Sequence, residues 1–344
     1  MDNKTESGVP SVIRVGSRSS ELAMIQTRTI ISALSALYPT INFEVITMKT
    51  IGDKILDKAL PKIGQTNLFT KELEIALAAN QIDMITHSLK DLPTTLPPNM
   101  QISVIYKRDN PTDAVVLHPK HKGLRIDTLP KGSIIGTSSL RRIAFLKRNY
   151  PDLIFQDIRG NLNTRLRKLD EGDGDITYDA IVLATAGLVR MGWQNRLSHE
   201  LDTTVCMYAV GQGALAVETR SDDDVINKLL SPLNDPCTVA CCTAERALLH
   251  SLGGGCSVPV GTCSSIDPDN HTLCIDGAVL SLDGKDLVKD VVTFVLPISY
   301  RELGFSELSG IVTKIGYDLA DKLQEKGAGP VLAKAKEYIE AVAK

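Results

Sequence analysis

Short apolar runs alternate with longer runs of helical periodicity through the first two thirds of this 344-residue chain. Residues 12–15 predict a strand, and the helix expected after it carries Leu22, Ile25 and Leu34 on one face. The same order returns around residues 82–92. Strands that alternate with helices predict parallel sheets built from right-handed crossovers. Ligands bind beyond the carboxyl ends of the strands in such folds.

The pattern also predicts where the chain passes between domains. A polar stretch at 107–112 and a glycine-rich turn at 208–213 are expected to be crossovers and hinges. From Cys237 onward the pattern changes to a small α+β arrangement, with strands around 273–280 and 288–296 and two closing helices. We therefore predict a first domain of residues 1–109 with 212–232, a second of residues 110–211 and a third of residues 233–344.

Several sequence patterns that would indicate a compartment or a ligand are absent from the chain. No apolar run approaches the roughly 20 residues that span a bilayer. The polar, mixed-charge residues 1–11 resemble neither a secretory nor a mitochondrial leader, so we expect a cytosolic protein. The turn at 210–217 has neither dinucleotide-binding nor P-loop spacing.

Positive charge is concentrated in one window of an otherwise acidic chain. Between Ser139 and Lys168, eight Lys/Arg stand against Asp152 and Asp157, whereas the whole chain carries −3. Such a charge run is often only a solvated helix face. Here the arginines follow predicted strands at the starts of helices, where unpaired N–H groups also favour anions. We therefore expect an anionic ligand held by several guanidinium groups.

Two side chains are chemically suggestive but ambiguous. Cys256 follows three glycines, so it could be an exposed nucleophile or attachment point, or a structural cysteine in a tight turn. Asp91 ends a strand beside Lys90 and could handle protons or cap a helix. Cys237, Cys241 and Cys242 lack a downstream Cys/His pair, so we expect them to be buried rather than metal ligands.

Five motifs in one order remove part of this ambiguity. They are His87–Pro93, Gly136–Arg142, Arg159–Arg165, Ala209–Ala214 and Gly255–Pro259. The series closely resembles the porphobilinogen deaminases, also called hydroxymethylbilane synthases, and the resemblance covers nearly the whole chain. The sequences of residues 159–170 and 207–214 resemble the eukaryotic branch of the family more closely than the bacterial branch.

The resemblance implies two periplasmic-binding-protein-like α/β domains with a basic cleft, plus a smaller C-terminal α+β domain. It implies a monomeric transferase of haem and tetrapyrrole biosynthesis. Such an enzyme joins four porphobilinogen molecules head to tail, with loss of ammonia, onto a dipyrromethane primer and releases hydroxymethylbilane by hydrolysis. No metal, nucleic acid or membrane is expected. The alternative is a non-catalytic anion-binding protein of the same fold.

The resemblance also assigns roles to single residues. Asp91 matches the catalytic aspartate, and Cys256 matches the cysteine that carries the dipyrromethane as a thioether. The expected cofactor-binding residues besides Cys256 are Ser88, Lys90, Ser139, Arg141, Arg142 and Arg165. The expected substrate-binding residues are Arg18, Ser20, Gln26, Arg159, Arg190 and Gln212. Arginines suit this task because every pyrrole unit carries an acetate and a propionate.

Two positions depart from the family pattern. Thr66 stands where relatives usually place a lysine, although Lys62 could compensate for its charge. Gly253 stands where relatives tend to have glutamate, from which we expect a looser cofactor loop.

Overall fold

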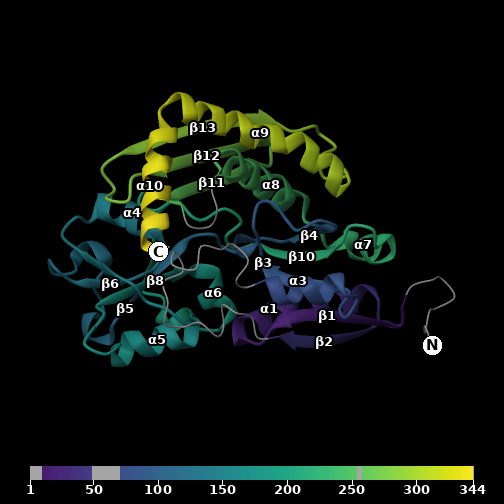
Figure 1. Ribbon diagram of the computed structural model, residues 1–344, viewed down its shortest axis with the longest axis horizontal. Helices are drawn as coiled ribbons and strands as arrows, with labels where there is room; N and C mark the ends of the chain where they lie inside the picture. Colours follow the sequence, from purple (N-terminus) through teal and green to yellow (C-terminus); the bar gives the residue numbers. More distant parts are fainter. Residues whose placement is uncertain (1–9, 49–69, 254–257, 344) are drawn as a thin grey trace.

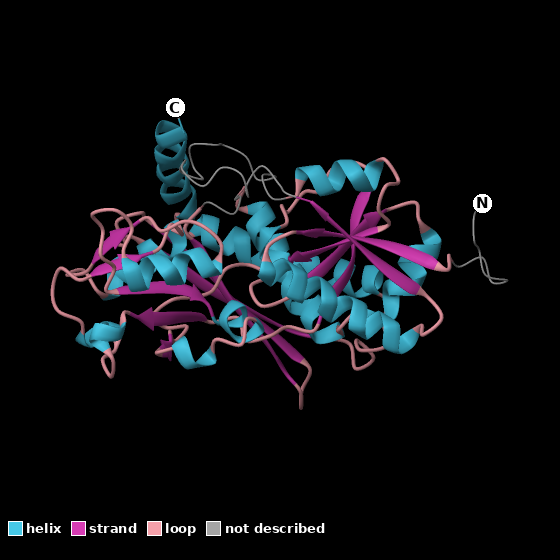
Figure 2. Cartoon of the chain, turned by 90° about the horizontal axis from the view of Figure 1, so that it is seen from below, coloured by secondary structure: helices cyan, strands magenta, loops and turns pink. Residues whose placement is uncertain are grey.

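The chain folds into three sheets with helices packed around them, and the computed structural model describes residues 10–48, 70–253 and 258–343 (Figure 1). Two five-stranded sheets lie side by side, and a three-stranded sheet lies across them (Figures 1 and 2). The expected fold class, two α/β units plus a smaller α+β unit, is confirmed. Within the described ranges, no helix has the length and apolar character needed to cross a membrane.

The first sheet has the strand order β2-β1-β3-β10-β4. Its strands are β1 (Val12–Arg18), β2 (Asn42–Met48), β3 (Met84–Ser88), β4 (Met100–Tyr106) and β10 (Leu215–Arg220), and its helices are α1 (Glu21–Leu37), α3 (Lys71–Ala78) and α7 (Asp224–Leu230). β1 is parallel to β2 and β3, as expected, whereas β10 is antiparallel to both β3 and β4. β10 differs because the chain enters it from the second crossover rather than from a covering helix.

The second sheet has the order β7-β6-β8-β5-β9. Its strands are β5 (Asp113–Leu117), β6 (Ile134–Gly136), β7 (Ile154–Gln156), β8 (Ala180–Ala184) and β9 (His199–Glu200), and its helices are α4 (Leu140–Asn149), α5 (Leu162–Glu171) and α6 (Thr185–Arg190). β6 is parallel to β7 and β8, but β5 is antiparallel to β8. The expectation of wholly parallel sheets was therefore wrong at the strands that follow a crossover.

The third sheet is an antiparallel meander covered by helices. It comprises β11 (Val260–Asp267), β12 (Thr272–Leu280) and β13 (Leu287–Val295), with α8 (Pro236–Ser251), α9 (Phe305–Glu325) and α10 (Ala328–Ala343). β11 was not predicted from the sequence. Gly316 lets α9 approach α8, since a Cβ there would lie 2.2 Å from Ala244 O. Cys241 and Cys242 are buried in this core, as expected.

The two crossovers run beside each other and are held by the third unit. Asp109 N donates to Gly213 O at 3.1 Å, which joins the outgoing and returning segments. Arg108 donates to Gln212 O at 2.8 Å and forms an ion pair of 2.6 Å with the buried Glu245 of α8. The crossovers are therefore fixed to each other and to α8. The exact domain limits stay a prediction.

Candidate functional site

Three adjoining cavities lie around the carboxyl end of β3. The first is also lined by α4 and α8, the second by α1, α5 and α6, and the third by β1 and α1. Their volumes are about 520, 100 and 60 Å³. Lys90 and Arg142 line both the first and the second, and Asp91 lines both the first and the third. Gln26 and Ser88 line the second and the third. Because the cavities share these walls, we treat them as one cleft.

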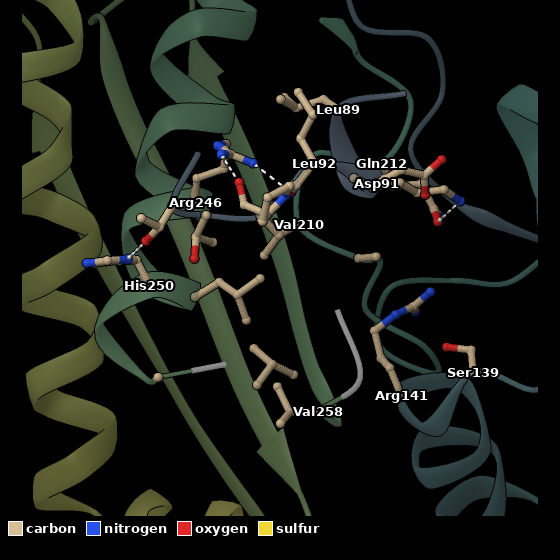
Figure 3. A pocket seen from close by; sticks show the side chains of 18 of the residues that line it. Leu89, Asp91, Leu92, Ser139, Arg141, Val210, Gln212, Arg246, His250 and Val258 are labelled. Carbon is tan, nitrogen blue, oxygen red and sulfur yellow. Dashed lines mark hydrogen bonds between the residues drawn. The ribbon is translucent and has the colours of Figure 1, made fainter. Parts of the chain in front are cut away.

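The segment after β3 carries Lys90 and Asp91 into the cleft. It forms a single 3-10 turn, Leu89–Asp91. Leu89 is fully buried, and its N–H donates to Ala214 O at 3.0 Å. The anchored leucine fixes the turn, so its polar neighbours are presented to the cavity instead of the core. Asp91 and Gln212, both labelled in Figure 3, line the first cavity.

Lys90 is partly buried, and its charged form is disfavoured in the ligand-free protein. Burial lowers its pKa to about 8, the repulsion of Arg142 adds to this effect, and Asp91 and Asp113 oppose it. Its Nζ donates to Gln212 Oε1 at 3.2 Å. An anion that entered the cleft would raise this pKa again, so the site favours negatively charged ligands.

Arg165 is a second cation whose charged form is disfavoured in the ligand-free protein. Burial lowers its pKa to about 10, and repulsion from Arg142 contributes. Its Nε donates to Gly160 O at 2.8 Å, but among the described residues no carboxylate lies within ion-pair distance of its guanidinium. Asn161 caps α5 by accepting from Thr164 N at 3.0 Å, which sets the start of the helix that presents Arg165.

Arg141 and Arg142 begin α4 and line the first cavity with Ser139. Both form ion pairs of 2.7 Å with Asp113. Ser139 Oγ caps the helix by accepting from Arg142 N at 3.4 Å. Figure 3 shows Ser139 and Arg141 on the α4 side of the cavity, away from Arg246 and His250. The sequence did not indicate Asp113 as the partner of Arg141 and Arg142, because no motif surrounds it in the chain.

The expected substrate-binding residues lie mainly in the two smaller cavities. Arg18 and Ser20 line the third, next to Gln26, whose Nε2 donates to Ser88 Oγ at 2.8 Å. Arg190 lines the second, where burial lowers its pKa and Asp109 accepts from its Nε at 2.8 Å. These residues come from different elements, so the fold brings them together.

Two of the expected substrate-binding residues differ from the others, one in its position and one in its contacts. Arg159 is not among the residues that line the three cavities, and it forms an ion pair of 2.9 Å with Asp157. Gln212 lines the first cavity, but its side chain already bonds Lys90, Pro111 O and Asp113. Their substrate-binding roles stay predictions.

Cys256 and Thr66 lie outside the described residues, as does Lys62. The described residues on either side of the Cys256 segment, Gly253 and Val258, both line the first cavity, and Val258 is labelled in Figure 3. Gly253 has φ of +60°, a conformation that favours glycine. Arg246 and His250 of α8 also line this cavity and were not predicted.

The sequence matches two family models that together cover most of the chain. Residues 13–228 match the model "Porphobilinogen deaminase, dipyromethane cofactor binding domain". Residues 239–297 match "Porphobilinogen deaminase, C-terminal domain".

Curated relatives agree with these models. The chain is 47% identical to the porphobilinogen deaminase of Nostoc sp., over 93% of each chain. It is 51% identical to that of Gloeobacter violaceus, over 80% of this chain and 83% of the relative. The likeness to the eukaryotic branch is not supported, because these relatives are cyanobacterial.

Among solved structures, the chain is similar to the alkanesulfonate-binding protein SsuA from Xanthomonas axonopodis. The identity is 12%, the coverage 70% of this chain and 75% of that one, and the TM-score 0.36. It is also similar to a regulatory domain of OxyR2 from Vibrio vulnificus, with 13% identity, coverage of 64% and 92%, and a TM-score of 0.40. These likenesses carry no functional weight.

Proposed function

Because this chain belongs to the porphobilinogen deaminase family, we propose that Asp91, Lys90 and the cleft arginines form its catalytic and carboxylate-binding site. The protein is a transferase, a hydroxymethylbilane synthase of tetrapyrrole and haem biosynthesis. It joins four porphobilinogen molecules head to tail, with loss of ammonia, and releases hydroxymethylbilane by hydrolysis. It uses a dipyrromethane cofactor.

The observation that carries this site assignment is Arg165, a partly buried cation with no carboxylate within ion-pair distance among the described residues. Burial lowers its pKa to about 10, and burial also lowers the pKa of the nearby Lys90. The buried Arg141 Nε also has no hydrogen-bond partner among the described residues. A group with several carboxylates would supply the missing charge and acceptors. A cavity of about 520 Å³ has the size expected for such a ligand.

The residues present therefore fit the dipyrromethane. We assign its carboxylates to Lys90, Ser139, Arg141 and Arg165, with Arg142 behind them and Ser88 at the adjoining wall. When bound, the cofactor supplies the pyrrole terminus that primes the chain. Cys256 is proposed as its attachment point. Two residues further along the chain, Val258 lines the cavity, which supports this assignment.

Asp91 is proposed as the catalytic carboxylate. It lines both the first and the third cavity, so one side chain can serve the primer on one side and an incoming ring on the other. A carboxylate there stabilises the positive charge that develops when ammonia leaves, and it can accept a proton.

Substrate carboxylates are assigned to the two smaller cavities. Arg18, Ser20 and Gln26 lie on the wall next to Asp91, and Arg190 lies on the opposite wall beside the crossovers. Arg159 and Gln212 complete the proposed set. Arginine forks register a carboxylate without reading the rest of the ring, which allows one cleft to hold chains of different length.

Three further features belong to the proposal. The domain limits 1–109 with 212–232, 110–211 and 233–344 agree with the sheet to which each strand belongs. We also propose that the protein acts as a monomer and binds no nucleic acid, since its basic groups line a cleft for small anions. A cytosolic location suits a charged, water-soluble substrate.

A direct assay separates this function from simple anion binding. Purified protein is incubated with porphobilinogen, and ammonia and hydroxymethylbilane are measured together. The account expects four ammonia molecules for each hydroxymethylbilane released. Saturable binding of porphobilinogen without any ammonia would instead favour the anion-binding alternative.

A further inference from the structure

Asp113 is a carboxylate that lies behind the cleft and is not among the residues that line the three cavities. It is the first residue of β5 and is fully buried. It accepts from Arg141 Nη1 at 2.7 Å, from Arg142 Nε and Nη2 at 3.1 and 2.7 Å, and from Gln212 Nε2 at 2.9 Å. Four charged or amide donors therefore converge on a single side chain.

Asp113 is held in its ionised form by the two arginines. The two guanidinium groups outweigh burial and hold its pKa far below the usual range. The neighbouring Cys206 thiol stays neutral, because burial raises its pKa to about 12. The unit formed by Arg141, Arg142 and Asp113 therefore carries a net charge of about +1 instead of +2.

The two arginines differ in how many of their N–H donors are already bonded within the protein. Arg142 has an acceptor within the protein for each of its three nitrogens, since its Nη1 donates to Val182 O at 2.7 Å. Arg141 binds Asp113 and Met207 O through Nη1 alone. Its Nε lacks a partner among the described residues. Arg141 thus keeps donors for a ligand, whereas Arg142 is mainly committed to the protein.

Gln212 connects this unit to the opposite wall of the cleft. Its Nε2 donates to Asp113 and to Pro111 O, and its Oε1 accepts from Lys90 Nζ at 3.2 Å. A continuous chain of hydrogen bonds therefore runs from Lys90, after β3, through both crossovers to the arginines of α4.

We propose that Asp113 is a positioning residue that takes the place of a ligand carboxylate between Arg141 and Arg142 and aligns them, through Gln212, with Lys90. This inference rests on the proposed function, because the aligned groups are those assigned to the cofactor carboxylates. Its physical basis is preorganisation: donors already held in place lose little freedom when the ligand arrives.

The test removes the carboxylate and then returns it as a small molecule. Asp113→Ala leaves room for formate beside Arg141 and Arg142, both of which line the first cavity. We expect the fraction of molecules that carry two pyrrole units, measured by intact mass, to fall by about tenfold or more, as for lost charged hydrogen bonds. Formate during expression or reconstitution should restore it, whereas chloride at equal ionic strength should not.

The matched control is Asp179→Ala. Asp179 lies in the same unit, bonds Lys120, His121 and Ile134 N, and does not line the three cavities. It should lose some thermal stability but keep its pyrrole content, with no response to formate. Normal loading of Asp113→Ala, or equal rescue by chloride, would overturn the proposal. A wild type that carries no pyrrole would instead contradict the proposed function itself.

A second variant covers the case in which Asp113→Ala does not fold. Asp113→Asn keeps the shape of the side chain but removes a charge that favours protonated Lys90. The other charged groups that act on Lys90 are Asp91, Arg141 and Arg142, and these are unchanged. The pH above which the cofactor-free protein no longer takes up its pyrrole units should therefore fall. An unchanged limit would contradict the positioning role, since a purely structural change shifts stability but not this limit.

Discussion

Lys90 Nζ lies 3.2 Å from Gln212 Oε1, which places a cation of the first sheet against the segment that returns from the second. The contact fixes a group that binds anions at the point where the chain passes between the two larger sheets. The cleft therefore depends on both the sheets and the crossovers, and its residues can be tested one by one.

The ionisation of Lys90 should set the upper pH limit of cofactor binding by the ligand-free protein. Its pKa of about 8 means that the binding form is present below this pH and is lost above it. Lys90→Arg, which stays charged, should move the alkaline limit of pyrrole loading of the cofactor-free protein to higher pH. Lys107→Arg, at an exposed crossover position, is the control and should leave this limit unchanged. An unmoved limit in Lys90→Arg would assign it to another group.

Lys90 also affects stability with the opposite dependence on pH. In the unfolded chain it holds its proton up to about pH 10.5, whereas the folded, ligand-free protein releases it near 8. The unfolded state therefore binds more protons between these values, and the free energy of unfolding should rise across the window. Urea unfolding of Cys256→Ser at several pH values, with Lys90→Met as the comparison, measures this contribution. Equal slopes in the two proteins would exclude it.

Asp91 should govern kcat more than KM. Asp91→Asn keeps the size of the side chain but removes the charge that stabilises the developing cation, and kcat should fall by about 10²- to 10³-fold. Asp109→Asn removes an exposed carboxylate that pairs with Arg190 and should act mainly on KM. Steady-state kinetics of both variants check the difference. A loss confined to KM in Asp91→Asn would show that this carboxylate only binds.

Arg165 should destabilise the cofactor-free protein but promote binding of the cofactor. Arg165→Met removes a buried cation that has no carboxylate within ion-pair distance among the described residues. In the cofactor-free Cys256→Ser protein, it should raise the free energy of unfolding by about 1 kcal/mol or more. The same change should reduce pyrrole loading in a chain that retains Cys256.

Arg167→Met is the control for that experiment. It lies on the same helix, but its side chain is exposed and, among the described residues, forms an ion pair only with Glu171 four residues on. It should change the free energy of unfolding by less than about 0.5 kcal/mol and leave loading intact. Destabilisation of the cofactor-free protein by Arg165→Met would contradict the idea that this cation awaits an anion.

Gly253 should resist substitution because of its backbone. With φ at +60°, any other residue is strained, so Gly253→Ala should cost about 1 kcal/mol in thermal or urea unfolding. Gly310→Ala, inside α9 where an added Cβ meets nothing, should instead stabilise by a similar amount. Equal effects of the two changes would mean that Gly253 does not hold this conformation. The looser loop expected from the departure at this position stays a prediction.

Much of the fold follows from local patterns in the sequence. The apolar periodicity of α1 and its end before Pro39 predicted that helix to within a residue or two. The direction of β5 and β10 could not be predicted, because it depends on how the crossovers return and not on the residues of the strands. β11 was missed because Gly261, Ser264 and Ser265 interrupt its apolar pattern, although the strand is paired along its whole length with β12.

The sequence predicted the site residues that stand in motifs. It did not predict the residues that bond to them and change their pKa. Lys90, Asp91 and the arginines stand in motifs at strand ends, where ligand chemistry is expected. Asp113 was missed because its partners lie 28 and 29 residues away, and Gln212 lies 99 residues away. Such pairings arise from tertiary packing, which one sequence does not display.

The central claim, a pyrrole primer attached to this chain, is tested most directly by intact-protein mass spectrometry of wild type and Cys256→Ser. The account predicts a wild-type excess equal to two linked pyrrole units, absent from the variant, and further increments when porphobilinogen is added to wild type. An unmodified wild-type mass that does not respond to porphobilinogen would contradict it.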